Sequence, residues 1–105
     1  MVDPDQTLFI SAVSFWEISM KFSLGRLELT HCSPDDLPAI AKQMGIEQLV
    51  LDNDLAARFH RLPRLIHKDP FDRMILWQAI EKKLCLISKD RQFDHYKQYG
   101  LRVLW

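Results

Sequence analysis

The sequence lacks several of the features from which a function is first inferred. Its 105 residues carry 14 lysines and arginines against 14 aspartates and glutamates, so the formal net charge is zero. That balance does not by itself favour a nucleic-acid binder. No apolar run approaches the length of a membrane span. The first residues, MVDPDQ, are polar and acidic, which is not the pattern of a signal peptide.

Cysteine is also scarce, since Cys32 and Cys85 are the only two and their spacing is not that of metal ligands. Cys85 lies in the apolar run LCLI, so we expect a buried thiol there, a buried Ile87 beside it, and no disulfide. A reducing cytoplasmic compartment fits this usage. The length, without repeats, low-complexity tracts or linker-like stretches, predicts a single domain over residues 1–105.

What the chain does contain is a regular alternation of short apolar runs and helical patterns. The apolar runs predict strands at residues 8–13, 47–51, 84–88 and 101–104. Capping signals predict helices from Ser14 to about Phe22, from Ser33 to Met44, from Asp52 to about His60, and from Pro70 onward. This order predicts an α/β fold with three layers, in which helices cover both faces of a mainly parallel sheet.

Four acidic residues stand at places where a helix or a turn begins. Asp69 precedes Pro70 and is the natural N-cap, and Asp72 is then the third helical residue. Glu17 follows Ser14 by three positions, which is the spacing of a capping box. Asp90 follows a predicted strand and can start a turn. A purely structural explanation is therefore open for each of them.

The predicted topology adds a second explanation for three of these acids. Glu17, Asp72 and Asp90 come from distant parts of the chain but lie near the edge where parallel strands end and ligands usually bind. Carboxylates brought together repel one another unless a cation neutralises them. Hard oxygen ligands with room for water suit Mg²⁺ or Mn²⁺. The topology therefore predicts that the three carboxylates point into one cleft.

Three segments carry a family resemblance that extends over essentially the whole chain: SAVSFWEISMKFSLGRLEL, HKDPFDRMILWQAIEKKLCLISKDRQF and YGLRVLW. Together they closely resemble the PIN domain, and in particular the VapC-type toxins of bacterial toxin–antitoxin pairs. The resemblance implies a cytoplasmic, Mg²⁺- or Mn²⁺-dependent endoribonuclease. It also implies RNA as the substrate, a cognate antitoxin as partner, and a possible homodimer.

The resemblance assigns roles to individual residues. Glu17, Asp72 and Asp90 match the family's acidic residues, which bind the metal and carry catalysis. Asp69 matches a supporting helix cap, and Ser88 matches a small polar residue at the end of a strand. Basic residues flank these acids in the sequence. They are candidates for contacts with RNA phosphates, and the alternative is that they are solvated surface charges. These residues are Lys21, Arg73, Lys89 and Arg91.

The sequence departs from the family pattern at its start. The family begins with a strand carrying an aspartate and then a helix, and Met1 stands only a few residues before the SAVSFWE segment. We therefore expect a shortened PIN fold without its first strand and helix. The alternative function is an inactive PIN-like module that binds an antitoxin or a second subunit through Trp16, Phe22, Leu24 and Leu27, although Trp16 and Phe22 are expected in the core. An upstream in-frame extension encoding a strand with an aspartate would favour the enzyme.

Overall fold

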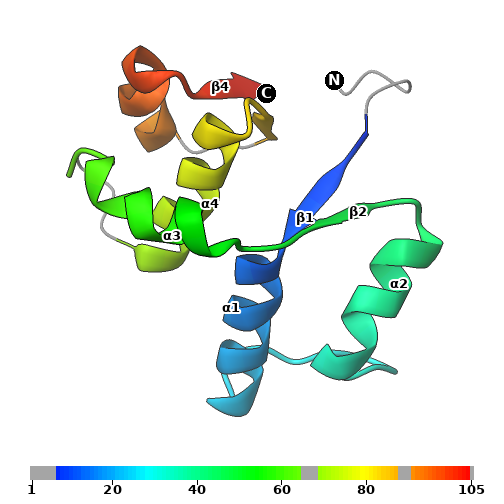
Figure 1. The fold of residues 1–105 in the computed structure, drawn as a ribbon. Helices are drawn as coiled ribbons and strands as arrows, with labels where there is room; N and C mark the ends of the chain where they lie inside the picture. Colours follow the sequence, from blue (N-terminus) through cyan, green and yellow to red (C-terminus); the bar gives the residue numbers. More distant parts are fainter. Residues whose placement is uncertain (1–6, 65–68, 88–90, 105) are drawn as a thin grey trace. The chain divides into compact units, whose positions relative to one another are not determined.

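The computed structural model describes residues 7–64, 69–87 and 91–104. The chain divides into two compact units, an N-terminal unit of Pro4–Val50 and a C-terminal unit that includes Leu51–Trp105. Each unit combines helices with one pair of parallel strands (Figure 1), so the fold is α/β as predicted. The three-layer arrangement stays a prediction. Within the described ranges, no helix is long and apolar enough to cross a membrane.

The N-terminal unit is a strand–helix–helix–strand arrangement. Its elements are β1 (Phe9–Ser11), α1 (Ala12–Ser23), the 3-10 helix η1 (Pro34–Asp36), α2 (Leu37–Gln43) and β2 (Glu47–Leu49). β1 and β2 pair in parallel, with Phe9 opposite Glu47. A parallel pair needs a long crossover, which the two helices provide. Gly25 and Gly45 follow α1 and α2 with φ of 72° and 78°, a left-handed conformation that favours glycine after a helix.

The first helix begins three residues earlier than the sequence predicted. Ser11, not Ser14, is the N-cap of α1, and its hydroxyl accepts a hydrogen bond from the Val13 amide at 3.0 Å. The capping box proposed for Ser14 and Glu17 is therefore wrong. The strand is shorter than predicted, so a serine at its end already has the extended backbone that an N-cap needs. Glu17 consequently lies in the second turn of α1 and does not cap it.

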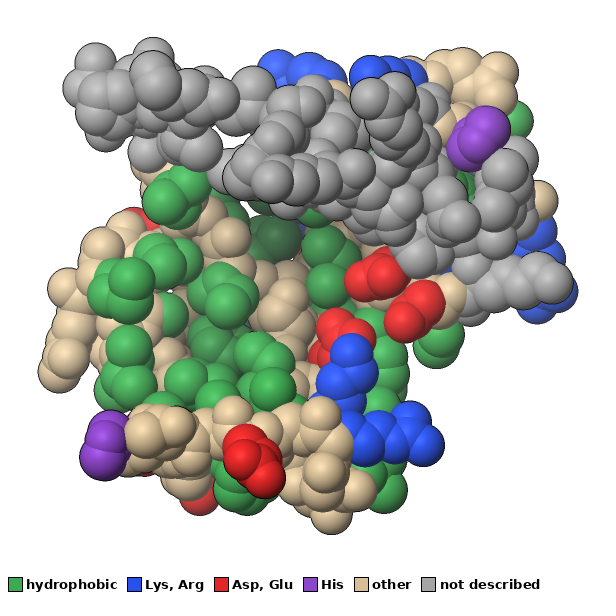
Figure 2. Space-filling view, turned by 180° about the vertical axis from the view of Figure 1, so that it is seen from behind, with side chains coloured by type: hydrophobic (Ala, Val, Ile, Leu, Met, Phe, Trp, Pro, Cys, Tyr) green, Lys and Arg blue, Asp and Glu red, His purple; other side chains and the backbone are tan. Residues whose placement is uncertain are grey.

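Large apolar side chains of the N-terminal unit are exposed to solvent. Trp16 is 61% exposed and Phe22 is 40% exposed, so the expectation that both lie in the core was wrong. The other exposed apolar side chains of this unit are Leu8, Phe9, Leu24, Met44 and Val50. Figure 2 shows apolar side chains spread over the surface of the unit. A two-stranded sheet with two short helices has too little interior to enclose them all.

The C-terminal unit contains the larger number of elements. They are α3 (Asn53–Ala57), the 3-10 helix η2 (Arg58–Arg61), α4 (Pro70–Glu81), β3 (Cys85–Ile87), the 3-10 helix η3 (Arg91–Tyr99) and β4 (Arg102–Leu104). β3 and β4 pair in parallel, with Cys85 opposite Arg102. The core of this unit contains Leu55, Leu62, Leu76, Trp77, Ala79, Tyr96 and Leu101.

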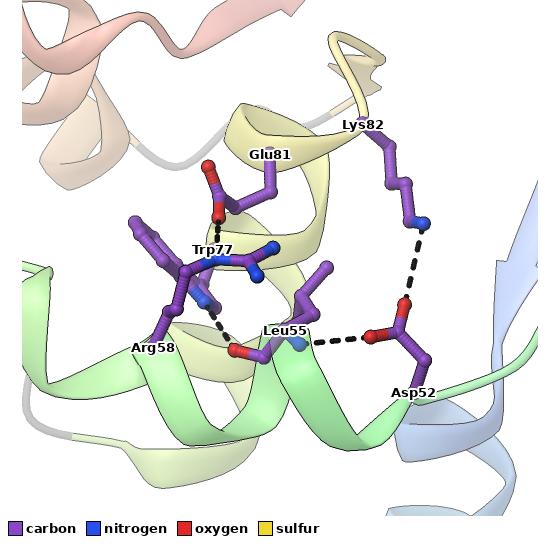
Figure 3. A network of polar contacts seen from close by, with 6 residues as sticks. All are labelled: Asp52, Leu55, Arg58, Trp77, Glu81 and Lys82. Carbon is purple, nitrogen blue, oxygen red and sulfur yellow. Dashed lines mark hydrogen bonds and ion pairs between the residues drawn. The ribbon is translucent and has the colours of Figure 1, made fainter.

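Polar contacts join α3 and η2 to α4 (Figure 3). The indole Nε1 of Trp77 donates to the carbonyl oxygen of Leu55 at 2.9 Å. Arg58 Nε lies 2.8 Å from Glu81 Oε1, and this carboxylate raises the pKa of Arg58. Asp52 caps α3 by accepting from the Leu55 amide at 2.8 Å. The first two contacts hold α3 and η2 against α4, which carries Asp72, and the third stabilises the start of α3.

The cysteine prediction was wrong in one respect, because Cys85 is exposed. Side chains alternate between the two faces of a strand. Leu84 and Leu86 pack against the core of the C-terminal unit, so the side chain between them points away from that core. The predicted burial of Ile87 concerns a side chain outside the described part of the structure. Cys32 and Cys85 are both free thiols.

Candidate metal site

The start of α4 places two aspartates close together. Asp69 is the N-cap, as predicted: its Oδ1 accepts from the amides of Phe71 at 2.9 Å and Asp72 at 3.4 Å. Pro70 is the first helical residue, where its missing N–H costs nothing and its fixed φ favours the helix. The sequence DPFD therefore starts the helix by ordinary capping chemistry and holds the Asp69 carboxylate in a defined place.

Asp72 is the third residue of the same helix, in its first turn, and is partly buried. An oxygen of its carboxylate lies within 4.8 Å of an oxygen of the Asp69 carboxylate. Two negative charges at this separation repel each other, and a cation between them removes that cost. The N-terminal end of α4 also carries a partial positive charge, which offsets part of the repulsion. The helix end thus offsets part of the repulsion between the two carboxylates, and a bound cation would reduce this repulsion further.

Glu17 belongs to α1, in the N-terminal unit. Its Oε2 accepts a hydrogen bond from Lys21 Nζ at 2.8 Å, across one helical turn. The Glu17 side chain is 17% exposed and the Lys21 side chain is 46% exposed. Because Ser11 caps the helix, Glu17 has no capping role. The structural role that remains for Glu17 is this ion pair with Lys21. The prediction that it shares a cleft with Asp72 and Asp90 stays a prediction.

The remaining predicted site residues fall into two groups. Ser88, Lys89 and Asp90 lie outside the described residues, and so does the side chain of Arg91. Arg73, in contrast, is described and has local contacts. Its Cζ lies 4.8 Å from the centre of the Phe59 ring, and its Nη2 donates to the Leu62 carbonyl oxygen at 3.4 Å. Arg73 therefore helps to pack α4 against η2, and its assignment to RNA stays a prediction.

The chemistry of the donors defines which cation the aspartate pair can hold. Asp69 and Asp72 offer hard carboxylate oxygens, which are the ligands of Mg²⁺, Mn²⁺ and Ca²⁺. One Asp69 oxygen is already engaged by two helix amides, so its second oxygen is the better donor to a metal. Partial exposure leaves room for water, which Mg²⁺ and Mn²⁺ keep in their coordination shell. The pair therefore fits a hydrated divalent cation.

A comparison with protein-family models matches residues 2–99 to the PIN domain. The chain belongs to the PIN domain family. PIN domains are generally nucleases that depend on divalent metals, in agreement with the carboxylate pair at the start of α4. A comparison with curated protein sequences found no match.

Sequence reasoning treated Asp69 in this PIN domain as a helix cap alone. The structure adds that its carboxylate lies beside that of Asp72. The spacing contained the signal, because residues three apart in a helix lie on neighbouring positions of one face.

Proposed function

We propose that this PIN domain is an endoribonuclease of the VapC toxin type, which hydrolyses RNA phosphodiester bonds at an acidic site holding Mg²⁺ or Mn²⁺. The observation that supports it best is the Asp69–Asp72 pair, at the position where the sequence resembles the family's acidic motif. Glu17, Asp72 and Asp90 are the proposed metal ligands and catalytic carboxylates. Asp69 supports them from the helix cap, and Ser88 precedes Asp90 as a small polar neighbour.

In this proposal the protein's own residues hold and orient the reacting groups. A divalent ion, when bound, lowers the pKa of a water and stabilises negative charge on the phosphate. The carboxylate of Asp72, with its helix fixed by the Asp69 cap, supplies a rigid oxygen donor. The basic residues proposed to hold the RNA backbone by charge are Lys21, Arg73, Lys89 and Arg91.

The proposal also covers the setting in which the enzyme works. We place it in the cytoplasm, with a cognate antitoxin that blocks its activity and with a homodimer as a possible assembly. The second candidate function is a PIN-like module that binds such a partner without cleaving RNA. The exposed Trp16 and Leu24, at 61% and 59%, favour it, because exposed large apolar side chains mark interaction surfaces.

Two isosteric variants test the metal site. Asp72→Asn and Asp69→Asn each remove one charge and keep the side-chain shape, and asparagine caps a helix about as well as aspartate. We expect Mn²⁺ to raise the melting temperature of the parent most, to raise that of Asp69→Asn less, because its amide oxygen is an uncharged donor, and to leave Asp72→Asn unchanged. Calorimetric titration with Mn²⁺ should give the same ranking, and cleavage of a fluorescent single-stranded RNA should be lost in Asp72→Asn.

Glu81→Gln is the matched control for these variants. Glu81 is also a carboxylate of α4, but it lies at the opposite end of the helix and pairs with Arg58. Its loss should leave the Mn²⁺ response intact. If Asp72→Asn responds to Mn²⁺ as the parent does, Asp72 only starts the helix and the nuclease proposal fails. Mn²⁺ binding without RNA cleavage would favour the non-enzymatic module.

A further inference from the structure

Glu17 and Lys21 form a close ion pair on one face of α1. Lys21 Nζ lies 2.8 Å from Glu17 Oε2. The carboxylate is the more enclosed partner, at 17% side-chain exposure, while the ammonium is 46% exposed. Glutamate followed by lysine four residues later is common on helices and adds little to their stability. The pair becomes informative only in view of the role proposed for Glu17.

A lysine in contact with a metal-binding carboxylate opposes the metal. Its ammonium engages a carboxylate oxygen, and its positive charge repels a divalent cation held by the same group. Lys21 Nζ lies 2.8 Å from the Glu17 carboxylate, well inside the screening length of about 8 Å at physiological salt, so solvent ions do not remove the repulsion. The lysine also steadies the glutamate, but ordering one partly exposed side chain is a small effect. Repulsion is therefore the larger of the two effects.

We propose that Lys21 is an exchangeable counter-ion of Glu17. Without RNA, its ammonium stays on the Glu17 carboxylate and weakens divalent-cation binding. When RNA binds, the ammonium turns to a backbone phosphate, and the carboxylate becomes available to the cation. The exposed, four-carbon stem of lysine allows this exchange without movement of the helix. RNA and metal then bind cooperatively, so the site fills mainly when its substrate is present.

This inference rests on the proposed function, and calorimetry can test it separately. Mn²⁺ is titrated into the parent, Lys21→Met and Lys21→Arg, each alone and with a short 2′-O-methyl RNA that supplies phosphates. Methionine favours helices and fills a similar volume, so Lys21→Met should fold. We expect Lys21→Met alone to bind Mn²⁺ about threefold to tenfold more tightly than the parent. Lys21→Arg, which keeps the charge, should resemble the parent.

The oligonucleotide supplies the decisive comparison. It should raise the Mn²⁺ affinity of the parent several-fold, and by linkage Mn²⁺ should raise the oligonucleotide's affinity by the same factor. It should have a clearly smaller effect on Lys21→Met. An oligonucleotide with a neutral methylphosphonate backbone should have no effect on either protein, because it offers no charge to the ammonium.

The outcomes separate this inference from the proposed function. If Asp72→Asn abolishes Mn²⁺ binding but Lys21→Met binds Mn²⁺ no more tightly than the parent, the counter-ion role is wrong and the metal site stands. Equal enhancement by the oligonucleotide in the parent and in Lys21→Met also overturns the counter-ion role. If the parent binds no Mn²⁺ with or without the oligonucleotide, both the metal site and the counter-ion role are overturned.

Discussion

The two units of the chain differ in how much apolar surface each encloses. In the C-terminal unit, Leu76 and Tyr96 are 0% exposed and Leu55 is 1% exposed. In the described part of the N-terminal unit, the buried apolar side chains are Val13 and Ala41. The C-terminal unit thus has a recognisable hydrophobic core. In the described part of the N-terminal unit, two small side chains are all that is buried of such a core.

The residues proposed for the candidate site come from both of these units, which differ in their packing. Burial of apolar surface is the main favourable contribution to folding, so the C-terminal unit is expected to supply most of the stability. The N-terminal unit contributes Glu17 and Lys21 on a helix with exposed aromatic side chains. Elements that bind ligands are often those of lower local stability. Asp72 therefore lies in the better packed C-terminal unit, and Glu17 lies in the less well packed N-terminal unit.

The largest expected effect is the loss of a core leucine in the C-terminal unit. Leu76 is 0% exposed, so Leu76→Ala leaves a cavity and should lower the free energy of unfolding by about 3 kcal/mol. Leu24→Ala makes the same chemical change in the N-terminal unit, at a side chain that is 59% exposed, and should cost less than about 1 kcal/mol. Urea denaturation measures both. Equal losses would show that the two units are equally well packed.

Amide hydrogen exchange compares the units in the unaltered protein. Exchange from the middle of α1 should be at least about tenfold faster than from the middle of α4, because fewer buried contacts must break for α1 to open. Leu76, Trp77, Gln78 and Ala79 give α4 four consecutive buried residues, whereas the buried residue of α1 is Val13. Mass spectrometry of peptic fragments would resolve the two helices. Protection of α1 equal to that of α4 would contradict the comparison.

The sequence was most informative where a local rule acts alone. The caps at Asp52 and Asp69 were predicted because an aspartate before a helical pattern has one dominant use. The same rule failed at Ser14, because Ser11 offers an equally good cap and the end of β1 selects it. Local capping rules therefore identify a helix start only when one candidate is present.

Burial was harder to predict because it depends on which elements pack together. Tyr96 belongs to a mostly polar segment, DHYKQY, yet it is fully buried in the core of the C-terminal unit. Trp16 is apolar and on a helix, yet it is exposed. Of the candidate site, the sequence assigned Asp72 to the metal and Asp69 to the helix cap, and in the structure an oxygen of each carboxylate lies within 4.8 Å of the other.

The smallest predicted effect is a pH dependence confined to the C-terminal unit. The pKa of Asp52 is lowered below its ordinary value of 3.8, first by the hydrogen bond from the Leu55 amide and then by Lys82. Lys82 Nζ lies 3.3 Å from Asp52 Oδ2. Folding therefore favours the charged carboxylate, and by linkage the resulting stability is fully present above the unfolded pKa. It is lost as the pH falls from about 3.8 through the lower folded value.

Two variants separate the charge of Asp52 from its capping role. Asn can accept the Leu55 amide but carries no charge, so Asp52→Asn should keep most of the stability at pH 7 and lose part of the decline below pH 4. Asp52→Ala removes both contributions and should be less stable than Asp52→Asn at pH 7. Urea unfolding monitored by tryptophan fluorescence between pH 2 and 7 measures both, because one of the three tryptophans, Trp77, is buried and donates to the Leu55 carbonyl oxygen of the same helix. If Asp52→Asn retains the parent's full decline in acid, the acid sensitivity of this unit originates in other carboxylates, and the cap at Asp52 stabilises α3 by geometry and not by charge.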